Sequence, residues 1–400
     1  MAARAAAASG AVYLDHNATT PIASEVLDAM RPYLERHFGN PSSAHGHGAI
    51  ASEAVAGARR DVAALLGCDP ERVVFTASGS EADNLAIKGA ALARRGDGDH
   101  IVTSAIEHPA VLATCRYLKD HLGYRLTIVP VDEWGLVDPD DVRGAIEPGT
   151  VLVTVMHANN EVGSLQPIAE IARIARERGI TFHTDAAQSV GKIPVDTDQL
   201  GVDLLTVTGH KLYAPKGVGA LYVRRGTRLD PLIHGGGQEH GLRGGTENVP
   251  YIIGLGAACA LAARRLQALE HQRVLRLRDR LHSALRSAVP GLLLNGHPER
   301  RLPNTLNVSF PGCDGEDLLG RTPSVDAATG SACHSGRTEP SPVLTAMGLD
   351  PQRALGAVRL SLGYDTTTGD VDAVVAALVA SALGAGRDSL LGARPPRSAA

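Results

Sequence analysis

Short apolar runs alternate with segments of helical periodicity along the first half of the chain. The helical segments include residues 50–66, which stop at Gly67, and residues 82–94. The apolar runs have the length of buried strands, and they are residues 73–75, 101–103, 126–131, 151–156, 181–184, 204–207 and 220–223. This alternation is typical of a parallel sheet with crossover helices, so we predict a large, doubly wound, mainly parallel α/β domain.

A different pattern begins near residue 255. Apolar positions keep a helical period from there to residue 289, and a helix of that length would carry the chain out of the first domain. Beyond it, strand-like runs and a final helical pattern predict a smaller α+β unit. The runs are 305–310, 324–328 and 358–362, and the helical pattern is 371–383.

These patterns predict a chain of two domains with extensions at both ends. The large domain covers residues 21–265, the smaller domain covers residues 266–384, and residues 11–20 pack on the smaller domain. The alanine-rich start, residues 1–10, and the Arg- and Pro-containing tail, residues 385–400, are predicted to be disordered.

The composition limits which cellular compartments and which kinds of partner we expect. A net charge of -4 over 400 residues gives no electrostatic footprint for nucleic acid or an anionic membrane. No apolar run approaches the roughly 18 residues of a membrane span. The five cysteines are odd in number and lack CxxC spacing. We therefore expect no disulfide framework and no metal site, and we predict a reducing, cytoplasmic location.

One lysine stands out as a candidate catalytic residue. Lys211 follows the apolar run 202–207 and is flanked by small and hydroxyl residues. Partial burial favours the neutral, nucleophilic amine, which can form a Schiff base with an aldehyde cofactor. Asp185 ends another apolar run and could pair with a pyridinium nitrogen. Together the two residues predict a site for pyridoxal 5'-phosphate (PLP).

The phosphate of such a cofactor needs donors. Residues 76–81, Thr-Ala-Ser-Gly-Ser-Glu, join a strand to a helix, where free N–H groups and the helix dipole attract anions. Taken alone, this turn could be only a helix cap. Thr208 and His210, beside Lys211, could donate to the same phosphate. A glycine-rich run at 234–248 is too polar for a core strand and is predicted to close over a site.

An ordered set of motifs covers residues 13–383. The motifs are NATTP at 17–21, FGNPSS at 38–43, EHPA at 107–110, HANNEVG at 157–163, DAAQ at 185–188, GHK at 209–211, RGGTEN at 243–248, GSAC at 330–333 and RLSLG at 359–363. The set resembles the cysteine desulfurases, which are class-V aminotransferases and PLP enzymes of fold type I. The resemblance implies conversion of L-cysteine to L-alanine, with the sulfur passing to Cys333 as a persulfide.

The resemblance also implies roles around the cofactor ring. Lys211 would hold the cofactor as a Schiff base and serve as the base for the α-proton of the substrate. Asp185 would pair with the pyridine nitrogen, and Gln188 would hydrogen-bond the phenolic oxygen. His108 would stack on the ring and help to move protons.

Further roles concern the phosphate and the substrate. Gly79, Ser80, Thr208 and His210 would bind the phosphate, and the neighbouring subunit of a homodimer would add Thr246. Asn160, beside the cofactor, would hold the substrate carboxylate together with Arg359, whose planar guanidinium suits that task. Cys333, on a mobile loop, would attack the substrate sulfur as a thiolate and pass it to an acceptor protein, for example a scaffold for iron–sulfur cluster assembly or a thiolation protein.

Alternatives remain open at the level of sequence. Residues 332–335 and 340–344 are also similar to selenocysteine lyases, so L-selenocysteine is a second possible substrate. Another class-V transamination or lyase reaction would make Cys333 incidental, and a non-catalytic scaffold would use the fold only for docking. Cys68, Cys115, Cys259 and Cys313 are interpreted as structural. His16, Gly244 and Tyr364 depart from the commonest family residues, but none of them has an assigned role.

Overall fold

The computed structural model describes residues 10–330, 332–334 and 337–391, with side chains outside 331–338 and 385–391. The predicted disorder of residues 1–9 and 392–400 lies outside the described residues. The predicted tail from residue 385 is wrong in its first part, because the last helix continues to Leu391. Extending an established helix by one residue costs little, so the two glycines near its end do not stop it.

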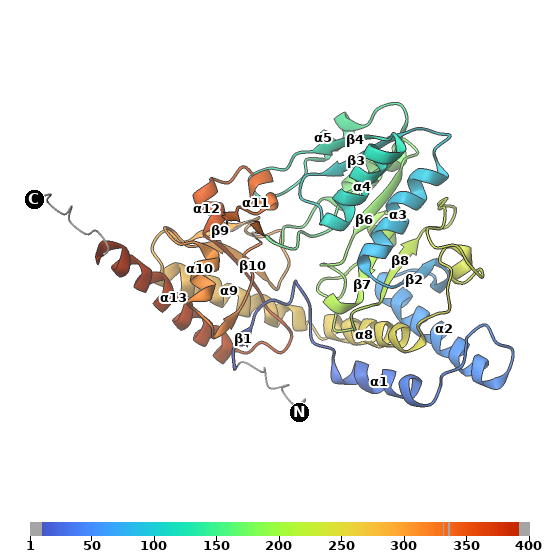
Figure 1. Cartoon of the computed structure of the whole chain (residues 1–400), viewed down its shortest axis with the longest axis horizontal. Coiled ribbons are helices and arrows are strands. Elements are labelled where there is room, and N and C mark those ends of the chain that lie inside the picture. The colour runs from blue at the N-terminus through green and yellow to red at the C-terminus, as the bar shows by residue number, and fades with distance from the viewer. Residues whose placement is uncertain (1–9, 331, 335–336, 392–400) are drawn as a thin grey trace, which may run out of the picture.

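A mixed seven-stranded sheet forms the larger half of the molecule (Figure 1). Its strand order is β2-β8-β7-β6-β5-β3-β4, and β7, β6, β5, β3 and β4 are parallel. Strand β8 runs antiparallel to both β2 and β7. The strands are β2 (Val73–Thr76), β3 (His100–Ser104), β4 (Arg125–Val129), β5 (Thr150–Thr154), β6 (Thr181–Asp185), β7 (Leu204–Thr208) and β8 (Gly219–Val223). The predicted doubly wound, mainly parallel sheet is confirmed.

Helices cover both faces of this sheet, as the alternating pattern predicted. Helix α2 ends where Gly67 adopts a left-handed conformation with φ of 67°, at the predicted stop. The helices are α1 (Ser24–Glu35), α2 (Gly46–Leu66), α3 (Gly79–Ala93), α4 (Pro109–Leu122), α5 (Pro139–Ala145), α6 (Ile168–Glu177), α7 (Thr197–Leu200) and α8 (Val249–Gln267), with 3-10 turns η1 (Pro70–Arg72), η2 (Gly209–Lys211) and η3 (Glu239–Gly241).

The single long helix predicted over residues 255–289 is wrong. The chain forms two helices, α8 and α9 (Glu270–Ala288), and Leu269 between them has a positive φ of 56°. A left-handed residue ends a helix although the apolar period continues across it. The break redirects the chain from the large sheet to the smaller half of the molecule.

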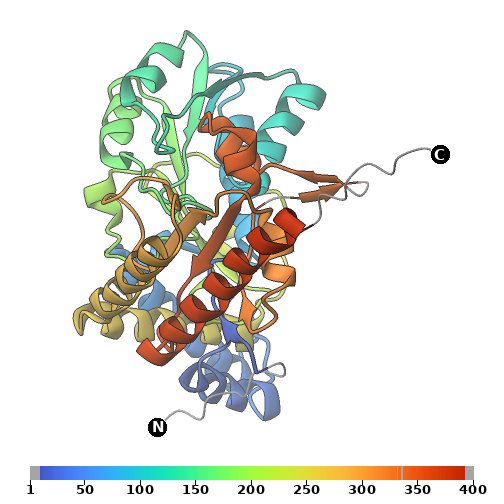
Figure 2. The same cartoon turned by 90° about the vertical axis from the view of Figure 1, so that its left-hand side faces the viewer.

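The smaller half is built on a three-stranded antiparallel sheet of order β14-β10-β9. Helices α9 and α13 lie side by side against it (Figure 2). Its core contains Leu281, Leu306 and Leu360, all fully buried. The elements are β9 (Leu293–Asn295), β10 (Thr305–Ser309), α10 (Gly315–Gly320), β11 (Val325–Asp326), α11 (Pro342–Ala346), α12 (Pro351–Leu355), β14 (Ala357–Ser361) and α13 (Thr368–Leu391).

The N-terminal segment lies against this smaller half. Strand β1 (Val12–Tyr13) pairs in parallel with β11, and Leu14 is fully buried in the core of the smaller half. The exact domain boundaries at residues 20 and 265 stay predictions.

The segment that carries Cys333 forms a hairpin rather than the predicted loop. Strand β12 (Ala332–His334) pairs antiparallel with β13 (Arg337–Glu339), and Cys333 lies opposite Thr338. The hairpin stands out from one side of the molecule in Figure 2. Ladder hydrogen bonds satisfy the backbone here without bulky side chains, which explains why the small residues of this segment gave no strand signal.

Helix α8 is long and apolar enough to cross a membrane by length and composition alone, with a mean hydropathy of 1.3. The expectation that no segment reaches that length is therefore wrong. In the structure 56% of this segment is buried, and α8 packs against α1 and α2. Core helices meet the same criterion, so the finding is weak evidence for a membrane.

Candidate active site

The predicted cofactor residues gather at the carboxyl edge of the large sheet. Asp185 is the last residue of β6, Thr208 is the last residue of β7, and Lys211 lies in the turn that follows. His108 and Asn160 lie in the loops after β3 and β5. Parallel sheets bind ligands at this edge because the loops from neighbouring strands converge there.

The start of α3 has the form of an anion site. Ser78 caps the helix by accepting a hydrogen bond from the Glu81 amide, at 3.0 Å. The amides of Gly79 and Ser80 meet no acceptor in the described part of the chain. A β-carbon on Gly79 would collide with the Thr208 hydroxyl, so the helix start and the end of β7 approach as closely as glycine allows. Both the cap and the free donors predicted from the sequence are present here.

His210 lies in the turn that follows Thr208. Its Nδ1 lies 3.1 Å from the Thr19 hydroxyl, and burial, then the charges of Lys211 and Lys216, lower its pKa to about 4. The ring is therefore neutral at neutral pH, and it can donate a hydrogen bond without carrying a charge.

Burial lowers the pKa of the Lys211 amine. The positive charge of Arg359 lowers the pKa further, whereas the carboxylate of Asp185 opposes the shift. These couplings bring the predicted lysine and acid into one electrostatic unit. A lowered pKa increases the fraction of neutral amine, which is the form that attacks an aldehyde.

His108 has a local structural role in addition to its predicted catalytic one. Its Nδ1 accepts a hydrogen bond from the Ala110 amide at 3.1 Å and so caps α4. Burial, followed by the charge of Lys211, lowers its pKa. In the neutral ring the proton must therefore be on Nε2, so the cap fixes the tautomer.

Two buried acids behind Asp185 were missed by the sequence interpretation. Asp83 and Glu107 each have one carboxyl oxygen without a hydrogen-bond partner among the described residues. Burial raises the pKa of Glu107 to about 8, and burial together with the charge of Asp185 raises the pKa of Asp83 well above its usual value. Both shifts favour the protonated, neutral form of these two carboxyl groups, which limits the negative charge that gathers around Asp185.

Asp185 itself accepts a hydrogen bond at Oδ1 from the Ala187 amide, at 2.9 Å. Two residues earlier on the same strand, His183 is fully buried. Its Nδ1 lies 2.8 Å from the Thr154 hydroxyl, and its Nε2 lies 3.1 Å from the Thr206 hydroxyl. Burial lowers the pKa of His183 to about 3. It is a satisfied neutral core histidine.

A second buried lysine, also missed, holds Gln188 in place. Lys192 Nζ donates to Gln188 Oε1 at 2.7 Å and to Asn17 Oδ1 at 3.0 Å. Gln188 Nε2 donates to the Asn17 carbonyl at 3.0 Å. Because a backbone carbonyl can only accept, the Asn17 carbonyl fixes which end of the Gln188 amide is the NH2 group. The second N–H of that group remains for the phenolic oxygen of a cofactor.

Asn17 links the two halves of the molecule. Its side-chain nitrogen donates to the Asn160 carbonyl at 3.1 Å and to the Thr305 hydroxyl at 2.8 Å, and its oxygen accepts from Asn304 at 3.0 Å. Its backbone amide donates to the Ser361 hydroxyl at 3.0 Å. The NATTP motif therefore positions both sides of the site, although the sequence indicated only family membership.

Arg359 is buried, and its guanidinium lies against the backbone of Asn160. It donates to Asp15 Oδ1 at 2.7 Å and to the Asn160 carbonyl at 3.1 Å, while its Nε has no partner among the described residues. An unpartnered buried guanidinium nitrogen is costly unless an anion completes it. Arg359 and Asn160, which the resemblance predicts to hold the substrate carboxylate, are therefore in contact in the structure.

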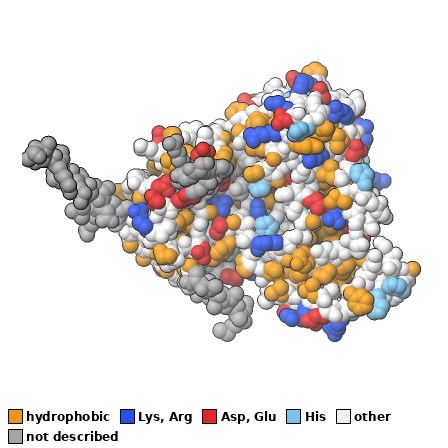
Figure 3. All heavy atoms as spheres, viewed as in Figure 1, with side chains coloured by type: hydrophobic (Ala, Val, Ile, Leu, Met, Phe, Trp, Pro, Cys, Tyr) orange, Lys and Arg blue, Asp and Glu red, His pale blue; other side chains and the backbone are white. Residues whose placement is uncertain are grey.

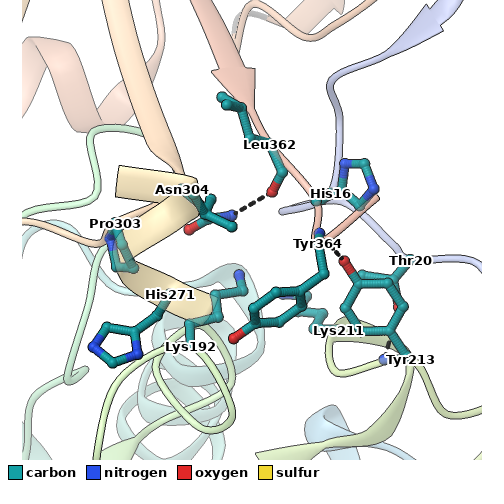
Figure 4. A pocket seen from close by; sticks show the side chains of 12 residues that line it. His16, Thr20, Lys192, Lys211, Tyr213, His271, Pro303, Asn304, Leu362 and Tyr364 are labelled. Carbon is teal, nitrogen blue, oxygen red and sulfur yellow. Dashed lines mark hydrogen bonds between the residues drawn. The ribbon is translucent and has the colours of Figure 1, made fainter. Parts of the chain in front are cut away.

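A pocket between the two halves is lined by Lys192 and Lys211 (Figure 4). The large half contributes Tyr213, and the smaller half contributes Asn304 and Tyr364. Tyr364 departs from the commonest family residue. Its hydroxyl donates to the Gly191 carbonyl at 2.9 Å, and its backbone N–H donates to Tyr213 Oη at 2.8 Å. The substitution therefore joins the two halves at the pocket wall.

Four of the five cysteines differ in how deeply they are buried. Cys115 and Cys259 are fully buried, and Cys68 and Cys313 are half-buried. Burial raises the pKa of all four thiols, that of Cys68 to about 12. The side chain of Cys333 lies outside the described residues. Among the described residues no group of three or more His, Cys, Asp or Glu is placed to hold a metal ion.

Thr246, the remaining predicted phosphate ligand, comes from a separate loop. It is exposed, in the glycine-rich run that the sequence predicted to close over a site. That run is anchored by Glu239, which pairs with Arg59 at 2.7 Å and accepts a hydrogen bond from the Phe75 amide at 2.8 Å. Within one chain Thr246 makes no hydrogen bond in the described part.

Comparisons with known proteins identify the family. The profile of the class-V aminotransferases matches residues 12–374. The chain therefore belongs to the class-V aminotransferase family, whose enzymes use PLP. Within that family it is similar to the cysteine desulfurase IscS of Methanosarcina thermophila, with 48% identity over 367 residues that cover 91% of this chain and 90% of that protein.

Other relatives agree. The cysteine desulfurase of Rattus norvegicus is 45% identical over 91% of this chain and 81% of its own length. A solved NifS-like protein superimposes with a TM-score of 0.86 at 38% identity, over 92% of this chain and 98% of that one. A structure of SspA in complex with cysteine has a TM-score of 0.77 at 39% identity, over 88% and 98%.

The residues present fit PLP. The free amides at the start of α3 supply phosphate donors, and Lys211, with its lowered pKa, supplies the amine. The carboxyl group of Asp185 supplies the acid, and the unpartnered Nε of Arg359 supplies the substrate anchor.

Proposed function

We propose that this protein is a PLP-dependent cysteine desulfurase that converts L-cysteine to L-alanine and retains the sulfur on Cys333 as a persulfide. The observation that carries the proposal is the meeting of Lys211, Asp185 and the Asn160–Arg359 pair at one sheet edge. The relatives are named for cysteine, which favours L-cysteine over L-selenocysteine.

Side chains of this protein bind the substrate and move its protons during the reaction. When bound, PLP supplies a conjugated ring that accepts the electron pair left when the Cα–H bond of the substrate breaks. Lys211 Nζ takes that proton, because its lowered pKa leaves the amine free to act as a base. Arg359 and Asn160 hold the carboxylate, which fixes Cα next to the base. His108 presents Nε2–H as the proton donor.

The sulfur step balances without an external oxidant. The Cys333 thiolate forms a bond to the substrate sulfur while the bond between that sulfur and Cβ breaks. The electron pair of the broken bond stays on the carbon side, which takes up a proton and leaves as L-alanine. One cysteine and one thiol thus give one alanine and one persulfide.

A homodimer with shared sites is part of the proposal. Thr246 is exposed, and Leu34 and Phe38 are 61% and 80% exposed at the end of α1. Figure 3 shows hydrophobic side chains gathered over the region of α1, α2 and α8. An apolar surface of this kind suits burial against a second copy, which would bring Thr246 to the other site.

Complementation tests the shared site. Subunits with Lys211→Ala and subunits with Thr246→Ala are each expected to be impaired, and mixing them should restore activity because one site of a mixed dimer keeps both residues. Absence of restoration after verified subunit exchange contradicts a shared site.

The persulfide requires a protein acceptor, and we propose delivery to an iron–sulfur scaffold or a thiolation protein in a reducing cytoplasm. A reducing cytoplasm keeps the thiol of Cys333 available. Transfer of labelled sulfur from the loaded protein to a candidate acceptor tests this part.

The overall function is tested with the purified protein. Its absorbance spectrum is recorded, and alanine and chalcogenide are quantified after addition of L-cysteine or L-selenocysteine under reductant. We expect a yellow protein that makes alanine and sulfide. A strong preference for L-selenocysteine would identify a lyase, keto-acid formation would identify another class-V reaction, and a colourless protein that PLP cannot reconstitute would reject the proposal.

A further inference from the structure

Glu161 is a buried acid to which the proposed reaction gives no role. It follows Asn160 in the loop after β5 and is 8% exposed. Its amide donates to Asn159 Oδ1 at 2.8 Å, and its carbonyl accepts from Asn307 at 3.2 Å. Its backbone is thus fixed to both halves of the molecule, which gives the carboxyl group a defined position.

One oxygen of this carboxyl group faces both ends of the segment that bears Cys333. Ser341, fully buried just after the hairpin, donates to Glu161 Oε2 at 2.5 Å. Gly330, just before the hairpin, has a positive φ of 77°, and a β-carbon there would collide with the same oxygen. The entry and the exit of the hairpin therefore meet at Glu161.

The hydrogen-bond pattern at Ser341 explains why an acceptor is needed. Ser341 Oγ caps α11 by accepting from the amides of Val343 and Leu344, at 3.1 and 3.4 Å. Its own hydrogen must then go to another acceptor, and Glu161 supplies one. Burial raises the pKa of Glu161 to about 7, while the Ser341 hydrogen bond and the charge of Arg359 oppose this shift.

We propose that Glu161 is a positioning residue that ties both ends of the Cys333 hairpin to the loop holding the substrate. Through its neighbour Asn160, the same loop contacts Arg359. The sulfur acceptor and the substrate carboxylate are thereby held by consecutive residues. This inference rests on the proposed function, since it assigns the tie a purpose in sulfur transfer.

The test compares Glu161→Ala with Glu161→Gln, which keeps an acceptor for Ser341, and with Glu170→Ala on the exposed face of α6 as a matched control. For Glu161→Ala we expect unchanged cofactor colour, a KM for L-cysteine within about twofold, and persulfide formation on Cys333 slowed about tenfold or more in a single turnover. Glu161→Gln should recover most of that rate, and the control should match the wild type.

A second measurement does not depend on activity. Hydrogen exchange of the backbone over residues 325–340 should be faster in Glu161→Ala than in the wild type, and Glu161→Gln should restore most of the wild-type rate because it keeps an acceptor for Ser341. Unchanged exchange together with an unchanged persulfide step overturns the inference. A raised KM with a normal persulfide step overturns it too, since Glu161 would then serve substrate binding.

The two proposals fail differently. If the wild type makes no persulfide from L-cysteine, the proposed function is wrong, and an unchanged exchange rate in Glu161→Ala would remove the tie as well. If the wild type is active and both readouts are unchanged, only the role of Glu161 is lost.

Discussion

The two sides of the active site are built in opposite ways. On the large sheet, Asp185, Thr208 and Lys211 are placed by the strands that immediately precede them. On the facing side, Arg359 is placed by Asp15 and Asn160, which are 344 and 199 residues away in the chain. The cofactor side is therefore local in sequence, whereas the substrate side exists only when distant segments meet.

This difference predicts that substitutions on the two sides affect different measurements. Changes on the sheet edge should alter the bound cofactor, and changes on the facing side should alter substrate affinity or sulfur transfer while the cofactor stays bound. The following substitutions test that separation.

The largest effect is expected at the sheet edge. Lys211→Ala should remove the borohydride-reducible link to PLP and lower alanine formation by roughly 10²–10⁴-fold or more, because the nucleophile and the base are lost together. Lys192→Met is the comparison, because Lys192 is also a buried lysine in the same pocket. It should keep the reducible link and shift only the absorbance, through the released Gln188. A retained link in Lys211→Ala would place the cofactor lysine elsewhere.

Cys333→Ser should be nearly as severe in turnover but without effect on the cofactor. The protein should stay yellow and change its spectrum with L-cysteine, yet form almost no alanine and no persulfide, because a hydroxyl is a poor sulfur acceptor. Cys313→Ser serves as the control in the same half of the molecule. Full turnover of Cys333→Ser would contradict the persulfide mechanism.

Arg359→Gln should raise the KM for L-cysteine by about 10–150-fold, the loss expected for a hydrogen bond between charged groups. The absorbance of the bound cofactor should stay as in the wild type. Steady-state kinetics and spectra on the same samples decide between the outcomes. If the cofactor is lost as well, the two sides are not separable.

The smallest effect concerns stability. The folded pKa of Glu107 is raised, to about 8, so the stabilising contribution of its protonated form is present at low pH and is lost as the pH rises through about 8. Glu107→Gln should therefore flatten the fall in stability between about pH 5 and pH 8. Denaturant midpoints at several pH values measure this, with Glu170→Gln as the control. An identical pH profile would mean that Glu107 is not protonated in the folded protein.

The same contrast explains how far the sequence could be interpreted. Strand ends and glycines are local signals, so the sheet, the start of α3 and the positions of Asp185 and Lys211 could be predicted. Lys192, Asn17 and Glu161 could not, because their roles come from contacts across more than 100 residues, such as Asn17 with Asn304 and Glu161 with Ser341.

Two errors have local causes. The break between α8 and α9 depends on the left-handed backbone of Leu269, which an apolar period does not reveal. The hairpin at Cys333 consists largely of small and polar residues, which carry little strand propensity.

The position of Asn17 has a consequence for synthesis of the chain. Asn17 leaves the ribosome early, but its partners Asn304, Thr305 and Ser361 are made near the end. The sheet edge with Asp185 and Lys211 is complete much sooner. Since domains generally fold as units during synthesis, a nascent chain can form the cofactor cradle before any substrate site exists. The protein would then acquire its cofactor and its reactivity at separate moments of its own production.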